Sequence, residues 1–183
     1  MNRKINVMYF SATDTTKKIV IRMAGKIIEI IDKPGMTGRE INFSFPEVRR
    51  ESVSFTSEDV VIIGVPVYAG RVPNVLTKYL NTITGNGSLA VAVVVYGNRD
   101  YDDALIELKD ILDANGFTVI AAAAFVGEHS FSRSLGANRP DEKDMKIVDD
   151  FAENICGKIN DQEQFHSIDV KGNRPYKKYY APK

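Results

Sequence analysis

The sequence predicts an α/β protein built on a doubly wound, five-stranded parallel sheet with strand order 2-1-3-4-5. Short apolar runs rich in Val and Ile recur along the chain, and each is too short for a helix of ordinary length. Helical patterns lie between these runs, and such alternation is typical of a parallel sheet covered by helices on both faces. Five candidate strands favour the order 2-1-3-4-5, which is common among doubly wound sheets.

The elements follow from these patterns in chain order. Strands buried on both faces are expected at residues 5–10, 60–65, 89–96 and 118–126, and a weaker edge strand at 39–43. Apolar side chains at helical spacing predict helices over residues 19–31, 75–80, 105–112 and 147–159. We expect the last helix to start at Pro140 and the third to stop at Asn115-Gly116. An irregular link, residues 44–59, stands where a crossover helix would ordinarily lie.

Composition limits the classes of function. With 183 residues, 44% of them hydrophobic, the chain fits one globular domain. Lys plus Arg equals Asp plus Glu at 24 each, so we expect neither nucleic acid nor a membrane as a partner. No signal peptide or membrane-length apolar segment is recognisable, and we expect a cytoplasmic protein. Cys156 is the one cysteine, which excludes an internal disulfide, and its place in a helical apolar stripe predicts burial.

The first predicted strand runs directly into a hydroxyl-rich loop. This loop, Ser11-Ala12-Thr13-Asp14-Thr15-Thr16, precedes a helix, and hydroxyls with backbone N–H groups at a helix N-terminus favour an anion such as phosphate. It matches neither a nucleotide-binding P-loop nor the Gly-rich dinucleotide motif. The alternative is a helix N-cap made by Thr13 or Asp14.

Two further strands end in loops that contain glycine and tyrosine. The third strand leads into Gly64-Val-Pro-Val-Tyr-Ala-Gly-Arg-Val-Pro73, and the fourth into Tyr96-Gly-Asn-Arg-Asp-Tyr101. Tyrosine rings stack on planar ligands, and the carboxyl ends of parallel strands share one edge of the sheet. The alternatives are a strand-to-helix turn with Pro73 at the first helical position and plain turn chemistry after Tyr96. Together the three loops predict a ligand with a phosphate tail and a flat head.

These loops resemble those of the flavodoxin family, most closely the flavodoxin domain of ferredoxin–flavodoxin fusion proteins. The resemblance implies a flavodoxin-like, FMN-binding domain over residues 1–160 and a C-terminal tail or linker over 161–183. It implies that the FMN phosphate is held by Ser11, Ala12, Thr13, Asp14, Thr15 and Thr16. It also implies that the isoalloxazine ring is enclosed by Pro66, Val67, Tyr68, Ala69 and Gly70 on one side and by Gly97, Asn98 and Tyr101 on the other, with Tyr101 as the stacking residue.

The resemblance further implies a flavoprotein that carries electrons at low potential to or from a ferredoxin-like protein or a reductase. Asp14 departs from the family, which usually has Gly there, and its carboxylate would repel a phosphate unless it turns outward. We expect Arg71 and Arg99 to lie near the flavin and to make its second potential less negative than in an acidic flavodoxin.

Two other functions remain open at this point. One is an NAD(P)H-dependent flavin or quinone reductase on the same fold, for which Glu128 and His129, after the fifth strand, could line a substrate pocket. The other is a binding module that has lost its flavin, for which Asp14 is the sequence argument.

Overall fold

One parallel sheet forms the centre of the molecule. The computed structural model describes residues 3–32, 34–129, 132, 134–161 and 164–179. Its five strands lie in the order β2-β1-β3-β4-β5, and every neighbouring pair is parallel, as the sequence predicts. The strands are β1 (Lys4–Tyr9), β2 (Thr37–Asn42), β3 (Asp59–Pro66), β4 (Leu89–Tyr96) and β5 (Thr118–Val126).

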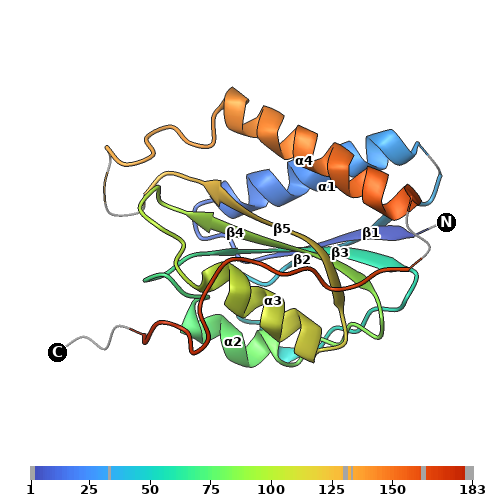
Figure 1. Cartoon of the computed structure of the whole chain (residues 1–183), viewed down its shortest axis with the longest axis horizontal. Helices are drawn as coiled ribbons and strands as arrows, with labels where there is room; N and C mark the ends of the chain where they lie inside the picture. The colour runs from blue at the N-terminus through green and yellow to red at the C-terminus, as the bar shows by residue number, and fades with distance from the viewer. Residues whose placement is uncertain (1–2, 33, 130–131, 133, 162–163, 180–183) are drawn as a thin grey trace.

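Helices cover both faces of this sheet. In Figure 1, α1 (Thr15–Ile31) and α4 (Glu142–Asp161) lie above the sheet, while α2 (Asn74–Leu80) and α3 (Ala104–Ala114) lie below it. These are the four helices that the apolar spacing predicts. The link between β2 and β3 contains a short 3₁₀ helix, η1 (Val48–Arg50), in place of a crossover α-helix.

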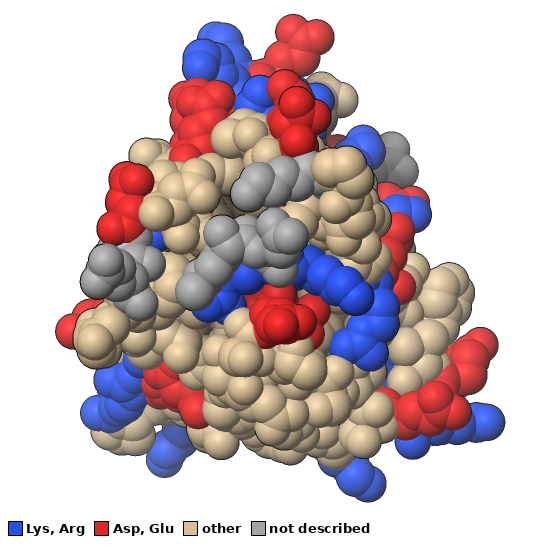
Figure 2. Space-filling model, turned by 90° about the vertical axis from the view of Figure 1, so that its right-hand side faces the viewer, with Lys and Arg blue, Asp and Glu red and all other residues tan. Residues whose placement is uncertain are grey.

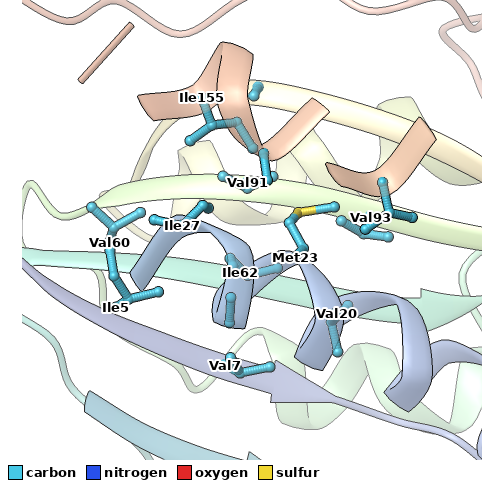
Figure 3. Close-up of a cluster of buried hydrophobic side chains, with 14 of the residues drawn as sticks. Ile5, Val7, Val20, Met23, Ile27, Val60, Ile62, Val91, Val93 and Ile155 are labelled. Atoms are coloured by element: carbon cyan, nitrogen blue, oxygen red, sulfur yellow. The ribbon is translucent and has the colours of Figure 1, made fainter. Parts of the chain in front are cut away.

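Alternation along the strands divides the buried side chains into two cores. Val91 and Val93 of β4 pack toward α1 and α4, whereas Ala92 and Val94 pack toward α2 and α3. Figure 3 shows the first core, which combines side chains of three strands and two helices: Ile5, Val7, Val20, Met23, Ile27, Val60, Ile62, Val91, Val93 and Ile155. Because both faces are covered, β3 and β4 read as continuous apolar runs.

The helix ends agree with the sequence to within two residues, except that α1 begins at Thr15, four residues before the predicted range 19–31. Helix α4 begins at Glu142 rather than Pro140, because the Asp141 carboxylate accepts a bond from the Asp144 N–H (3.0 Å) and the Asp144 carboxylate accepts one from the Asp141 N–H (2.8 Å). Cys156 of α4 is buried, as predicted, and burial raises the pKa of its thiol.

The segment after α4 has no helix or strand over residues 164–179, yet it is anchored to the domain. The Ile168 N–H donates to the Val119 carbonyl (2.9 Å), and the Ser167 hydroxyl donates to the Asp113 carboxylate (2.7 Å). In Figure 1 this segment, in red, crosses in front of α3 and ends on the side where the loops after β4 and β5 lie.

Charges of both signs are mixed at one end of the molecule. Figure 2 shows the end of the molecule opposite those loops, where Lys and Arg side chains alternate with Asp and Glu. In the parts of the chain that the structure describes, no helix is both long and apolar enough to cross a membrane.

Candidate functional site

The loops at the carboxyl edge of the sheet enclose a cavity of about 540 Å³. Parallel register brings them together, since the Phe10 N–H bonds to the Gly64 carbonyl (3.0 Å) and the Gly127 N–H to that of Tyr96 (2.8 Å). The cavity is lined by residues at or just after the carboxyl ends of β1, β3, β4 and β5: Ala12, Thr13, Thr15, Thr16, Pro66, Val67, Tyr68, Ala69, Gly70, Val95, Tyr96, Gly97, Arg99, Asp100, Asp102, Gly127, Glu128 and His129.

The loop between β1 and α1 presents unused hydrogen-bond donors. The Ser11 hydroxyl accepts a bond from the Lys17 N–H (3.2 Å), and the Lys18 N–H bonds to the Asp14 carbonyl (2.9 Å). Within the described part of the chain, no atom accepts a bond from the backbone N–H groups of residues 12–16. These donors lie at the positive end of the α1 dipole, so an anion would be favoured there.

Asp14 fits this loop through its backbone. Its φ is 58°, in the left-handed region that Asp tolerates better than most residues. Asp14 is exposed and is absent from the cavity lining. The alternative of a side-chain cap by Thr13 or Asp14 is wrong, since Asp14 makes no such bond and the Thr13 hydroxyl contacts that of Thr15 at 3.2 Å.

A tight turn, Tyr68–Arg71, forms the second wall. The N–H of each end residue bonds to the carbonyl of the other (3.0 and 3.1 Å), and Ala69 and Gly70 both have positive φ (52° and 80°). Positive φ at both central positions defines a type I′ turn. A Cβ on Gly70 would lie 2.1 Å from Asp102 Oδ2, so glycine is required both for its φ and for this close approach.

The loop after β4 forms the third wall and differs from the prediction in its aromatic residue. Tyr96 lines the cavity, whereas Tyr101 is half-buried in an edge-to-face contact with Tyr96, with the ring centroids 5.5 Å apart. Tyr101 also packs against the core beneath the sheet. His129 lies directly over Gly97, where a Cβ would be 2.5 Å from its Cδ2.

The structure therefore brings most of the predicted residues to one cavity. Ten of the predicted residues line it: Ala12, Thr13, Thr15, Thr16, Pro66, Val67, Tyr68, Ala69, Gly70 and Gly97. Ser11, Asp14, Asn98 and Tyr101 lie outside the lining. That any of these fourteen residues binds FMN stays a prediction.

Sequence reasoning missed Val95 and Gly127 in the lining and favoured Tyr101 over Tyr96. Gly127 had a readable signal, because it ends the fifth strand at the same sheet edge as the three loops. A Cβ at this position would lie 2.6 Å from Thr15 Cγ2, so Gly127 lets the loops after β5 and β1 approach.

Arg71 does not face the cavity, contrary to expectation. Its guanidinium forms a two-bond ion pair with the Glu107 carboxylate (both 2.7 Å), which raises the pKa of Arg71, and it also bonds to the Lys177 carbonyl. The Arg71 charge is therefore neutralised within the protein. The lining contains Arg99 together with three carboxylates, of Asp100, Asp102 and Glu128, so the predicted effect of Arg71 on the potential loses its basis.

With this geometry the chain can be compared with known proteins. The sheet order and the helices on both faces define a flavodoxin-like fold. No protein-family model matches the sequence, and no curated protein matches it either.

Among solved structures, oxidised flavodoxin 2 from Bacillus cereus is similar at 16% identity and a TM-score of 0.59, over 85% of this chain and 99% of that one. A flavodoxin from Fusobacterium nucleatum bound to flavin mononucleotide is similar at 16% identity and a TM-score of 0.52, over 85% of this chain and 98% of that one. An NADH:FMN oxidoreductase in its apo form shares 17% identity at a TM-score of 0.57, over 85% of this chain and 89% of that one.

Proposed function

We propose that this protein is a flavodoxin-like electron-transfer protein that binds FMN noncovalently and works at low potential. The observation that carries the proposal is the set of unused N–H donors of residues 12–16, which open on the same cavity as the Tyr68 and Tyr96 walls. Donors at one end and apolar walls at the other match a ligand with a phosphate and a planar ring system.

The residues of the cavity fit FMN. The backbone of Ala12, Thr13 and Thr15 with the two threonine hydroxyls would hold the phosphate, and the turn Tyr68–Arg71 with Gly97 would border the ring. When bound, FMN would supply one- and two-electron transfer, which is chemistry of the cofactor. Asp102 is paired with Lys177, but the carboxylates of Asp100 and Glu128 still outnumber Arg99 around the cavity and would oppose added negative charge, which supports a low potential.

The mouth of the cavity is the surface that a redox partner would approach. Tyr68 is 44% exposed there, and Arg99 and Asp100 stand beside it. We propose a ferredoxin-like protein or a reductase as the partner, which the charges of this rim would orient.

A second function is an NAD(P)H-dependent flavin or quinone reductase. The observation in its favour is that Glu128 and His129 both line the cavity, and the NADH:FMN oxidoreductase among the structural neighbours shares the fold. The third reading, a flavin-free binding module, loses its argument because Asp14 lies outside the lining.

The decisive experiment is a fluorescence titration of the purified protein with FMN and, separately, with riboflavin, which lacks the phosphate. The proposal expects quenching of FMN at micromolar concentration or below and at least tenfold weaker binding of riboflavin. Replacement of both Thr13 and Thr15 by Ala should weaken FMN binding alone, while Thr82→Ala, at the far end of α2, serves as a matched control.

Equal binding of FMN and riboflavin would refute a phosphate-binding site at residues 12–16, and no binding of either would refute a flavin function. Steady-state oxidation of NADH or NADPH by the FMN-loaded protein, with quinone or free flavin as acceptor, decides between carrier and reductase. Absence of turnover supports the carrier.

A further inference from the structure

The C-terminal segment is bound by a stripe of acids on α3. Asp103, just before the helix, and Glu107, Asp110 and Asp113 within it follow one another at spacings of three or four residues, so they lie on one helix face. Each accepts a hydrogen bond from the segment after α4. Asp103 accepts from Asn173 and Lys177, and Glu107 accepts from Tyr179. Asp110 accepts from Arg174 and Tyr176, and Asp113 accepts from Ser167.

The contacts are close and specific. Asp103 is buried and accepts bonds from the Asn173 N–H (2.8 Å) and the Lys177 N–H (2.6 Å). Burial alone would raise the pKa of Asp103, but these N–H groups hold it below its ordinary value. The Arg174 Nε lies 2.7 Å from Asp110, and a Cβ on Gly172 would lie 2.2 Å from Ile106, so the chain runs tightly against the helix.

The same segment reaches the turn that forms the cavity wall. Its rings enclose the Arg71 guanidinium, whose central carbon lies 4.8 Å from the Tyr176 centroid and 4.2 Å from that of Tyr179. The Tyr179 hydroxyl lies 3.0 Å from the Val72 carbonyl. The Lys177 Nζ pairs at 2.8 Å with Asp102, which lines the cavity and lies against Gly70.

We propose that residues 173–179 form a strap that positions the turn Tyr68–Arg71 and Asp102, and so sets the shape of the cavity. The turn needs such support, because a left-handed conformation is unfavourable for a residue other than glycine, here Ala69, and persists only where its surroundings determine it. The Asp103 N–H, which bonds to the Gly70 carbonyl (3.0 Å), joins the turn to the residue that holds the strap. The inference rests on the proposed function only for the identity of the ligand.

The test uses the full chain without added flavin and measures amide hydrogen exchange by mass spectrometry. Asp110→Asn removes the negative charge and one of the two oxygens that accept bonds from Arg174 and Tyr176, without touching the turn, and Asp150→Asn, in an exposed pair with Lys146 on α4, is the matched control. We expect exchange of residues 66–73 to accelerate by about threefold to tenfold in Asp110→Asn alone. Core amides of β3 and β4 should not change, and Asp110→Glu should restore protection.

Two results would overturn the strap: no protection of residues 173–179 in the wild type, or faster exchange of 173–179 in Asp110→Asn with 66–73 unchanged. If Asp110→Asn fails to fold, Tyr179→Phe takes its place, because it keeps the ring and loses only the hydroxyl that faces Val72 and Glu107.

A second readout concerns the flavin itself. The midpoint potential of bound FMN should shift in Asp110→Asn and stay at the wild-type value in Asp150→Asn, and an unshifted potential would overturn the positioning role. Failure of the wild type to bind FMN would refute the proposed function, whereas the exchange experiment would still decide on the strap.

Discussion

The Arg71–Glu107 ion pair offers a quantitative test of how the cavity wall is held. Both side chains are nearly enclosed, with 9% and 5% of their surfaces exposed. Glu107 accepts two bonds from Arg71 at 2.7 Å, one from the Val72 N–H at 2.9 Å and one from the Tyr179 hydroxyl at 3.1 Å. Glu107→Gln keeps the size of the side chain, removes its charge and turns an NH₂ group toward these donors.

We expect Glu107→Gln to lower the free energy of unfolding by about 3–5 kcal/mol, because removing one partner leaves a buried guanidinium without its counter-charge. The measurement is urea denaturation followed by circular dichroism at pH 7. Asp150→Asn is again the control, since its pair with Lys146 is exposed on both sides and should contribute little to stability.

The double variant Arg71→Met with Glu107→Leu separates the charge from the packing. It should recover most of the loss, because two apolar residues of similar volume leave no unpaired buried charge. A loss below about 1 kcal/mol for Glu107→Gln would contradict the reasoning, as it would mean that water reaches the pair and screens it.

Three further predictions concern other parts of the chain. Asp14→Gly should tighten FMN binding by about threefold to tenfold at low salt and less at high salt, since it removes a carboxylate beside the proposed phosphate seat; unchanged affinity would contradict it. Arg139 holds the pKa of Asp144 below its ordinary 3.8, so the ionised Asp144 should stabilise the protein above pH 3.8 and lose this effect as the pH falls through its lowered pKa. Urea denaturation should therefore show that Asp144→Asn is less stable than the wild type at pH 7, and that this difference vanishes in solution more acidic than the lowered pKa. Cys156 should react with a thiol reagent only upon unfolding, and rapid labelling of the native protein would refute its burial.

The elements of the fold were predictable because each depends on local chain rules. Runs such as Leu89–Tyr96 are apolar throughout, and a strand buried on both faces needs that composition. The donor-rich loop between β1 and α1 was predictable for the same reason, because the first backbone N–H groups of a helix have no partner within the helix, whatever the rest of the chain is. Only the exact ends of helices and strands differ, by up to four residues at the start of α1.

Side-chain directions at the ring end of the cavity were not predictable. Tyr96 and Tyr101 are both tyrosines of one loop, and which of them faces the cavity depends on how the other packs against the core. Arg71 follows two residues of positive φ, which reverse the direction of the chain, so its side chain points toward α3 and contacts Glu107 there. The partner of Arg71 lies 36 residues away, and no local pattern connects the two.

The two ends of the cavity are therefore held by different kinds of contact. Donors at residues 12–16 are fixed by the backbone of β1 and α1, whereas the wall at Tyr68–Arg71 is fixed by a helix and by the strap, over 100 residues away along the chain. A backbone site recognises a phosphate almost independently of sequence, but a wall held by side chains changes when any of them changes. Affinity for the phosphate end should thus tolerate substitution in α3 and the strap, while the environment of the ring, and with it the potential, should respond to the same substitutions.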